Sequence, residues 1–138
     1  TPMQIARAYA VIANGGYLVT PHLSKLAKEN LSFRQPIKVD IDPKHLQVIR
    51  NGLSKVVQSG TGVSLNYGSY NLPPISGKTG TAEDPLGGPD HAWFVCFAPS
   101  DNSEILVVAF AENTPGGGSV HALPMAKRIL EEWYKKIN

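Results

Sequence analysis

Four consecutive residues, Lys78, Thr79, Gly80 and Thr81, carry groups that together could bind and activate an anionic substrate. On a β-strand, Lys78 and Gly80 would point to one face and Thr79 and Thr81 to the other, because side chains alternate. A lysine can orient an anion or pass a proton, threonine hydroxyls can donate to a carboxylate, and a glycine lets a substrate backbone lie close. A backbone N–H at the strand edge can also face a developing oxyanion. The alternative is an edge-strand lysine that only prevents aggregation.

Two glycine-containing segments resemble nucleotide-binding loops, but neither fits. Gly77-Lys78-Thr79 would end a phosphate-binding loop only if a glycine stood five residues earlier, where the sequence has Leu72, and if a helix followed directly. The glycines 116–118 would begin a dinucleotide-binding turn only if position 121 were glycine, and it is His121. We therefore interpret 116–118 as a flexible connection between a strand and a helix.

No residues have the spacing of a metal site or of a second acid/base pair. The four histidines include no pair at i and i+4 and no HExxH motif. His91 follows a glycine-rich turn, which favours a role in turn support, and Glu83 and Asp84 have no partner at a recognisable spacing. Cys96 is the only cysteine, which excludes an internal disulfide and a cysteine-based zinc cluster. We therefore expect no metal site.

The composition is that of one globular domain. The chain has 138 residues, of which 42% are apolar and 17% charged, and this is enough for a sizeable core. The net charge of +2 comes from 13 basic and 11 acidic residues, and the basic ones are scattered, which gives no argument for nucleic acid binding. The apolar content excludes disorder, and no apolar run approaches the ~18 residues of a membrane helix.

Three helices are expected around the candidate site. Thr1-Pro2 suits a helix start, and Asn14-Gly15-Gly16 suits the end of that helix. Asp42-Pro43 repeats the start signal before a second helix near 43–58. A closing helix carries one apolar face, on which we expect Trp133 to belong to the core. The residues of that face are Ala126, Ile129, Leu130, Trp133 and Ile137.

Three strands are expected between the second and the closing helix. Two prolines lead into a strand over 75–82 that is rich in small residues. The apolar, β-prone runs 92–98 and 105–111 are separated by the turn-forming residues 99–103 and predict a hairpin. The order of elements predicts an α+β fold, in which helices pack on an antiparallel sheet of three strands, with no repeat and no domain boundary.

The remaining segments give weaker signals. Residues 17–23 are short and β-prone, and 25–38 favour a surface loop with short strands. Thr61 can cap a short helix that runs through Leu65. None of these segments changes the predicted fold class.

The segment Gly77–Ala82, Gly-Lys-Thr-Gly-Thr-Ala, resembles the third motif, K-T-G, of penicillin-binding proteins, whose other motifs are S-x-x-K and S-x-N. The sequence around it resembles the class B members of that family, in the same order and over essentially the whole chain. Within the class the resemblance leans toward the elongation enzyme, penicillin-binding protein 2. The segments that carry it are Thr1–Ala10, Ala13–Gly16, Pro21–Leu23, Gly60–Gly62, His91–Phe94, Phe97–Pro99 and the closing glycine-rich turn.

The resemblance implies a partial penicillin-binding, serine β-lactamase-like transpeptidase fold and a D,D-transpeptidase that cross-links peptidoglycan. In that family a serine attacks the penultimate D-Ala carbonyl of a stem peptide, releases the terminal D-Ala and passes the acyl group to an amine. β-Lactams acylate the same serine. No metal and no organic cofactor is implied.

The resemblance also implies roles for the four residues of the candidate site. Lys78 would bond the serine of the middle motif, support proton transfer and anchor the substrate. The hydroxyls of Thr79 and Thr81 would hold the carboxylate of the substrate or antibiotic, next to Gly80. The backbone N–H of Thr81 would form one half of the oxyanion hole.

The nucleophile motif of the family is missing from the chain. No serine is followed by a lysine three residues later. Ser100-Asp101-Asn102 spells the middle motif, but it follows K-T-G along the chain and lies in the predicted hairpin turn, so we interpret it as turn-forming. We therefore expect residues 1–138 to be the C-terminal portion of one transpeptidase domain whose upstream half carries the nucleophile. The resemblance implies two further strands in that half and an open edge on the strand at 104–112. We therefore expect this chain either to be poorly stable alone or to be an autonomous remnant or a product of proteolysis.

Two alternative functions share part of this pattern. Because the nucleophile is missing, the chain could be a non-catalytic segment of the same fold that binds peptidoglycan or a partner. The three-motif pattern also occurs in β-lactamases and β-lactam sensors, although Thr1–Gln4 and His91–Phe94 favour the transpeptidase.

The resemblance has further implications for ligands, partners and location. The expected ligands are peptidoglycan stem peptides and β-lactams, and no nucleic acid is expected. The expected location is the extracytoplasmic face of the bacterial cytoplasmic membrane, in the periplasm, with the membrane anchor outside these residues. A membrane glycosyltransferase is an expected partner of the longer protein.

Overall fold

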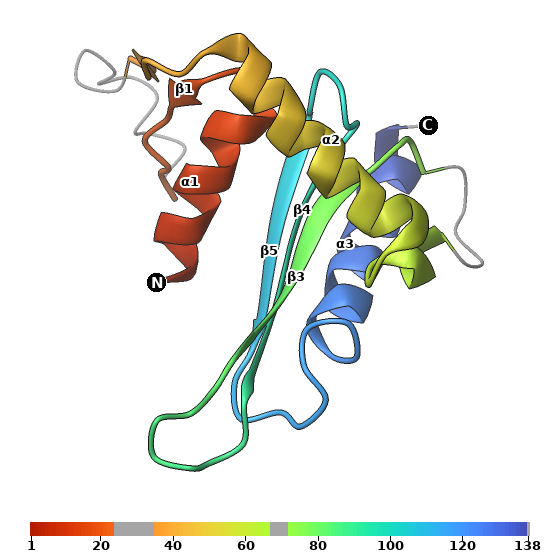
Figure 1. Ribbon diagram of the computed structural model, residues 1–138. Coiled ribbons are helices and arrows are strands. Elements are labelled where there is room, and N and C mark those ends of the chain that lie inside the picture. The colour runs from red at the N-terminus through yellow and green to blue at the C-terminus, as the bar shows by residue number, and fades with distance from the viewer. Residues whose placement is uncertain (24–34, 67–71, 138) are drawn as a thin grey trace.

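The computed structural model describes residues 1–23, 35–66 and 72–137, and its main sheet lies between helices (Figure 1). The part of the chain that the structure describes has an α+β fold, as predicted. Its elements, in chain order, are α1 (Pro2–Ala13), β1 (Tyr17–Leu18), β2 (Ile37–Lys38), α2 (Pro43–Ser59), the 3-10 helix η3 (Val63–Asn66), β3 (Ser76–Ala82), β4 (His91–Ala98), β5 (Ile105–Ala111) and α3 (Ala122–Ile137).

Side chains cap the first turns of α1 and α2 by accepting hydrogen bonds from backbone N–H groups that have no partner within the helix. The Thr1 hydroxyl accepts a hydrogen bond from the Gln4 N–H, and the Gln4 side chain accepts one from the Thr1 amino group, which completes a capping box. The carboxylate of Asp42 accepts from the Lys44 N–H at 2.8 Å and begins α2. The predicted starts of both helices are therefore confirmed.

The main sheet has the order β3-β4-β5 and is antiparallel throughout. Lys78 pairs with Val95, and Thr79 pairs with Phe94, so these two site residues lie on opposite faces of the sheet. The predicted strands and the predicted β4–β5 hairpin are confirmed. In the described ranges, a second small sheet pairs β1 with β2. Of the short strands expected over 25–38, β2 is observed, and residues 24–34 lie outside the described residues.

The face of the sheet that carries Phe94 packs on α3 and holds most of the core. Phe94 and Cys96 are fully buried there, against Leu123, Ala126 and Leu130 of α3. The same cluster extends to the end of α2 and to η3 through Val57, Leu65, Ile75, Ala92, Ala98, Val107, Ala109 and Ala122. Burial of this apolar surface is the main stabilising term for the position of β3.

The opposite face, which carries Lys78, packs on α1 and on the middle of α2 at Leu53. Phe97 is fully buried there in a smaller cluster with Ala13 and Leu53, and Tyr9 and Leu106 pack against it. Helices α1 and α3 thus lie on opposite sides of the sheet, which Figure 1 shows in red and blue. The sheet is held from both sides along β4 and β5.

The prediction that Trp133 belongs to the core is wrong. Trp133 is 41% exposed and Ile129 is 48% exposed, whereas Ala126 and Leu130 of the predicted face are buried. Ile129 and Trp133 instead line an open cavity of about 410 Å³ on the outer side of α3, together with Arg128, Glu132 and Lys136. The apolar residues of α3 lie on more than one side of the helix. The side that packs on the sheet carries Leu123, Ala126 and Leu130. The side chain of Ile137 lies outside the described residues.

None of the helices in the described ranges is both long and apolar enough to cross a membrane.

We expect the thiol of Cys96 to be almost unreactive in the folded protein. It lies on the central strand β4 and is fully buried in the core cluster that includes α3, and this burial raises its pKa to about 12. Since the thiolate is the nucleophile, alkylation by iodoacetamide at pH 8 should be on the order of 10³ times slower in the native than in the unfolded protein. Mass spectrometry over time gives both rates. Equal alkylation rates in the native and the unfolded protein would show that the reagent reaches Cys96 in the folded core.

Candidate active site

The strand β3 carries all four predicted site residues and is fixed at its start. The Ser76 side chain is 1% exposed and its hydroxyl donates to the Ser100 hydroxyl at 2.9 Å. At Gly77, an added Cβ would lie 2.8 Å from the Val95 carbonyl oxygen and 3.0 Å from Cys96 Cβ. A glycine is therefore required where β3 lies tightest on β4, directly before Lys78.

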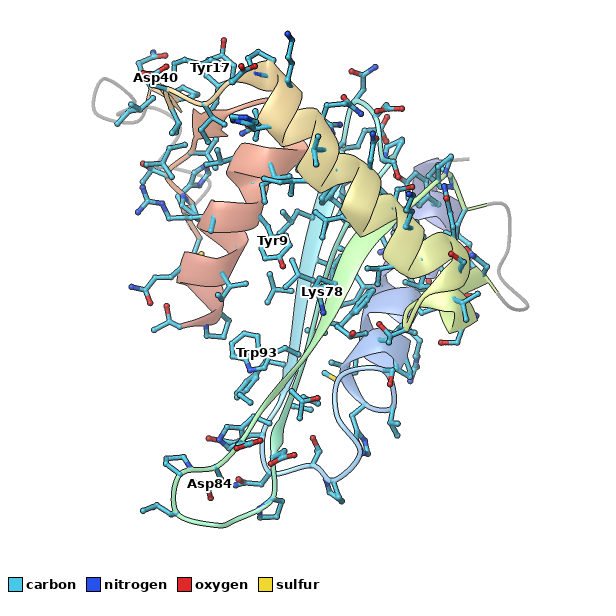
Figure 2. All side chains as sticks on the ribbon, in the orientation of Figure 1. Tyr9, Tyr17, Asp40, Lys78, Asp84 and Trp93 are labelled. Atoms are coloured by element: carbon cyan, nitrogen blue, oxygen red, sulfur yellow. The ribbon has the colours of Figure 1, made fainter. Side chains whose placement is uncertain are left out.

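Lys78 faces an apolar cavity between the sheet and α1. The cavity measures about 270 Å³ and is lined by Ile5, Tyr9, Lys78, Thr79, Gly80, Trp93 and Val95. Figure 2 shows Tyr9, Lys78 and Trp93 on this side of the sheet. Lys78 Nζ donates to the backbone carbonyl of Thr79 at 2.7 Å, and the side chain of Lys78 is exposed. The ammonium group is thus accessible to an anion that enters the cavity.

Tyr9 contributes a neutral phenol to the wall of this cavity. Burial raises the pKa of Tyr9 above its usual value of 10.0. The phenol therefore stays protonated at neutral pH, and it adds a polar group without a competing charge beside Lys78.

Thr79 is held from a different part of the chain. Its hydroxyl lies 2.7 Å from the hydroxyl of Thr61, in the loop between α2 and η3. Thr61 was expected to cap the short helix that follows, and η3 does follow, but the hydrogen bond of the Thr61 side chain is made to Thr79 instead. The structure thus adds Thr61 to the site.

Thr81 lies against the glycine-rich connection between β5 and α3. An added Cβ on Gly117 would lie 2.5 Å from the Thr81 hydroxyl oxygen. An added Cβ on Gly118 would meet the Trp93 carbonyl oxygen, the Gly80 carbonyl oxygen at 2.7 Å and the Gly80 nitrogen at 2.9 Å. Both glycines are buried. The connection therefore lies directly on the backbone of β3 at Gly80 and Thr81.

Two hydrogen bonds close the glycine-rich connection. The Nε2–H of His121 donates to the Pro115 carbonyl at 2.6 Å, and the Leu123 N–H donates to the Gly118 carbonyl at 2.9 Å. The prediction that 116–118 connect a strand to a helix is confirmed. The sequence, however, gave no reason to expect that these glycines also pack on the site strand.

The structure brings three of the four predicted residues to one cavity and leaves one outside it. Lys78, Thr79 and Gly80 line the cavity, whereas Thr81 is exposed on the strand beside Gly117. Sequence reasoning missed Thr61 as a partner of the site. The only signal was the Gly60-Thr61-Gly62 segment, whose flanking glycines indicate a tight loop but do not say what the threonine contacts.

Other polar residues near the sheet have structural roles. Asp84 accepts from the N–H groups of Leu86 and Gly88, both at 3.0 Å, within the β3–β4 turn that Figure 2 shows at the far end of the sheet. His91 Nδ1 accepts from the Asn113 N–H at 3.1 Å, which confirms turn support. Residues 100–102 lie in the β4–β5 turn. Among residues 1–23, 35–66 and 72–137, no group of three His, Cys, Asp or Glu side chains is placed to hold a metal ion.

Comparison with known proteins decides the family. The family model of the penicillin-binding protein transpeptidase domain matches residues 1–131. The chain belongs to this family. The match includes β3 with its Lys78-Thr79-Gly80 sequence. The α+β fold with a three-stranded antiparallel sheet is that of penicillin-binding protein transpeptidase domains.

Individual members of the family support the assignment over almost the whole chain. The chain is 34% identical to the peptidoglycan D,D-transpeptidase MrdA of Acinetobacter baumannii over 153 aligned residues, which cover 96% of the chain and 22% of that protein. The structure of penicillin-binding protein 2 from Helicobacter pylori is similar with a TM-score of 0.79 and 26% identity, and the match covers 99% of this chain and 24% of that one.

A third similar structure is that of a peptidoglycan synthase complex, described for its coordination of polymerization and crosslinking. Here the TM-score is 0.71 and the identity 37%, over 97% of this chain and 23% of that one. The chain thus spans about a quarter of the length of each of these proteins.

Proposed function

We propose that this chain is the K-T-G-bearing portion of a peptidoglycan D,D-transpeptidase that acts by serine acyl transfer and is a target of β-lactams. The observation that carries the proposal is the placement of Lys78 and Thr79 at one accessible cavity on the K-T-G strand of a transpeptidase-family domain. The similar MrdA protein of Acinetobacter baumannii is a peptidoglycan D,D-transpeptidase, which supports the same activity for this chain. A shared fold alone would not suffice, since function resides in the site.

The catalytic groups come from two parts of the domain: this chain, and the part that carries the nucleophile. A serine, supplied by the part of the domain outside these residues, attacks the penultimate D-Ala carbonyl of the donor peptide. The tetrahedral intermediate collapses with release of D-Ala, whose amino group takes up a proton. The acceptor amine then attacks the acyl-enzyme, loses a proton, and regenerates the serine. Residues 1–138 contribute the groups that orient the substrate and stabilise charge.

Lys78 supplies the positive charge and the hydrogens of an ammonium group. It is exposed at an apolar cavity, so its ammonium group can attract an anionic group that enters. In the reaction, Lys78 bonds the serine of the middle motif and supports proton transfer to and from the reacting atoms.

Thr79 and Thr81 supply hydroxyl groups for the terminal carboxylate of the donor peptide. The backbone N–H of Thr81 supplies one half of the oxyanion hole, and the N–H of the nucleophile supplies the other. Gly80 has no side chain on the cavity face, so a substrate backbone can approach β3 closely.

The longer protein acts on the extracytoplasmic face of the cytoplasmic membrane, where peptidoglycan is cross-linked. A membrane glycosyltransferase is the partner that this proposal assigns to it. The similar structure described as a peptidoglycan synthase complex supports such a partner, because it couples polymerization with crosslinking.

The direct test is product analysis with a pentapeptide donor and an acceptor amine. A transpeptidase releases D-Ala and forms the cross-linked product in equal amounts. A β-lactamase instead turns over a penicillin rapidly and forms no cross-link, and a binding segment does neither. Either of the last two results, in the full-length protein, would reject the proposal.

We expect Thr81→Val to weaken carboxylate binding and to spare the chemical step. Valine removes the hydroxyl but keeps the backbone N–H, so the oxyanion hole remains. One hydrogen bond to an ionised group is worth about 1.5–3 kcal/mol, so KM for the donor should rise by at least about 10-fold. Steady-state kinetics measures this. A collapse of kcat at saturating donor would contradict the role given to the hydroxyl.

A further inference from the structure

The loop between α2 and η3 is closed tightly on the end of α2. The N–H groups of Gly60 and Gly62 both donate to the Val56 carbonyl, at 3.1 and 2.9 Å. Added Cβ atoms on these glycines would lie 2.9 Å from Val56 Cα and 3.2 Å from the Val56 carbonyl oxygen. The residue between them, Thr61, is exposed. Two glycines thus let the chain turn back on the helix, and Thr61 is left at the tip of the loop.

The loop is also held in place at its other end, where it joins η3. Leu65 of η3 is fully buried in the core cluster that contains Val57. The Asn66 side-chain amide donates to the Val57 carbonyl at 2.8 Å. Thr61 is therefore carried by a loop with a fixed position relative to β3, and its distance of 2.7 Å from the Thr79 hydroxyl is a consequence of that position.

Each of these two hydroxyls has a single hydrogen. In a hydroxyl pair, one oxygen donates and the other accepts, and the acceptor keeps its own hydrogen for a further partner. A carboxylate only accepts hydrogen bonds. When Thr79 donates to a carboxylate, the bond between the hydroxyls must therefore run from Thr61 to Thr79, and the two bonds strengthen each other.

The surroundings of Thr79 favour an anion as that further partner. Lys78 Nζ lies 2.7 Å from the carbonyl oxygen of the same residue. Lys78 and Thr79 both line the cavity of about 270 Å³, and none of its lining residues in the described ranges is acidic. Lys78 and Thr79 alternate across β3, but both residues border this cavity, so its wall has an ammonium group and a hydroxyl on neighbouring residues.

We propose that Thr61 is a positioning residue, which holds the Thr79 hydroxyl and directs its hydrogen toward the carboxylate of the ligand. This inference rests on the proposed function, because it concerns the carboxylate of the same donor peptide or β-lactam. It adds a residue outside the K-T-G strand to carboxylate recognition.

The test compares two penicillins in the full-length protein, one with its free carboxylate and the same compound as the methyl ester. In Thr61→Val, we expect the acylation efficiency to fall about 5-fold for the free carboxylate, the effect of one neutral hydrogen bond, and to change less than about 2-fold for the ester. Saturation kinetics should place the loss in the affinity of the first complex. Thr61→Ser, which keeps the hydroxyl, should behave like the wild type.

A matched control separates positioning from general destabilisation. Ser54 is on α2, the helix before the Thr61 loop, and its hydroxyl accepts from the Gln58 side chain at 3.0 Å, so Ser54→Ala removes a nearby hydroxyl whose hydrogen bond is made within the helix. It should leave the ratio of the two penicillins unchanged. An equal loss for both penicillins in Thr61→Val, or no loss, would overturn the inference.

If Thr61→Val folds poorly, Thr61→Ala removes the same hydroxyl with a smaller side chain and takes its place in these tests. A double-mutant cycle with Thr79 then tests whether the two hydroxyls act together. Thr79→Val should produce the same selective loss, and Thr61→Val in that background should add nothing for the free carboxylate. Additive losses would overturn the inference. The proposed function fails separately, if the wild-type protein is acylated by neither compound.

Discussion

Replacement of Lys78 by alanine should lower the acylation rate of the full-length protein by a factor of about 10²–10⁴, the usual contribution of a positioned acid/base group. Lys78 is exposed, and its hydrogen bond is to a carbonyl of the neighbouring residue, so its removal leaves the core untouched. The thermal midpoint should therefore stay the same. Stopped-flow or quenched acylation with a reactive penicillin gives the rate.

Two further variants show what Lys78 contributes. Lys78→Arg keeps the positive charge but cannot pass a proton at neutral pH, so it should remain well below the wild type. Lys44→Ala removes an exposed lysine at the start of α2 and should acylate normally. Unchanged acylation in Lys78→Ala would remove Lys78 from the mechanism.

We expect Gly118→Ala to lower both the stability and the acylation rate, although Gly118 lies outside the K-T-G strand. The added Cβ would collide with the Trp93 carbonyl and with both the nitrogen and the carbonyl oxygen of Gly80. These are backbone atoms of paired strands and cannot swing away. Either the glycine-rich connection or β3 must shift, which costs about 1–3 kcal/mol of stability. Since a displacement of about 1 Å at reacting groups can cost 10²-fold in rate, we expect an acylation loss of that order.

The control for this variant is Gly52→Ala. Gly52 lies within α2, and an added Cβ there has no atom within 4 Å. Alanine in a helix interior is favoured over glycine by about 0.5–1 kcal/mol, so this variant should be slightly more stable and fully active. Wild-type stability and acylation in Gly118→Ala would show that the connection does not hold β3.

Most of the fold could be predicted because local patterns determine it. The caps at Thr1 and Asp42 and the apolar runs of β4 and β5 each act over a few residues, and each was found where expected. The opposite orientation of Lys78 and Thr79 also follows from strand alternation alone.

The errors and omissions concern contacts between distant segments. An apolar helix stripe shows which residues can be buried but not which side meets the sheet, and so Trp133 was wrongly expected in the core. The pair of Thr61 and Thr79, 18 residues apart, depends on how α2 crosses the sheet. The contact of Gly118 with Gly80 depends on the return of the chain after β5. Neither contact has a local pattern.

The most direct test of the proposed function is the intact mass of the full-length protein after incubation with a reactive penicillin. We expect a covalent adduct of one penicillin, on a serine that lies outside residues 1–138 and precedes a lysine by three positions. We also expect no adduct on the 138-residue chain alone. An adduct on a residue of this chain, or none on the full-length protein, would contradict the account.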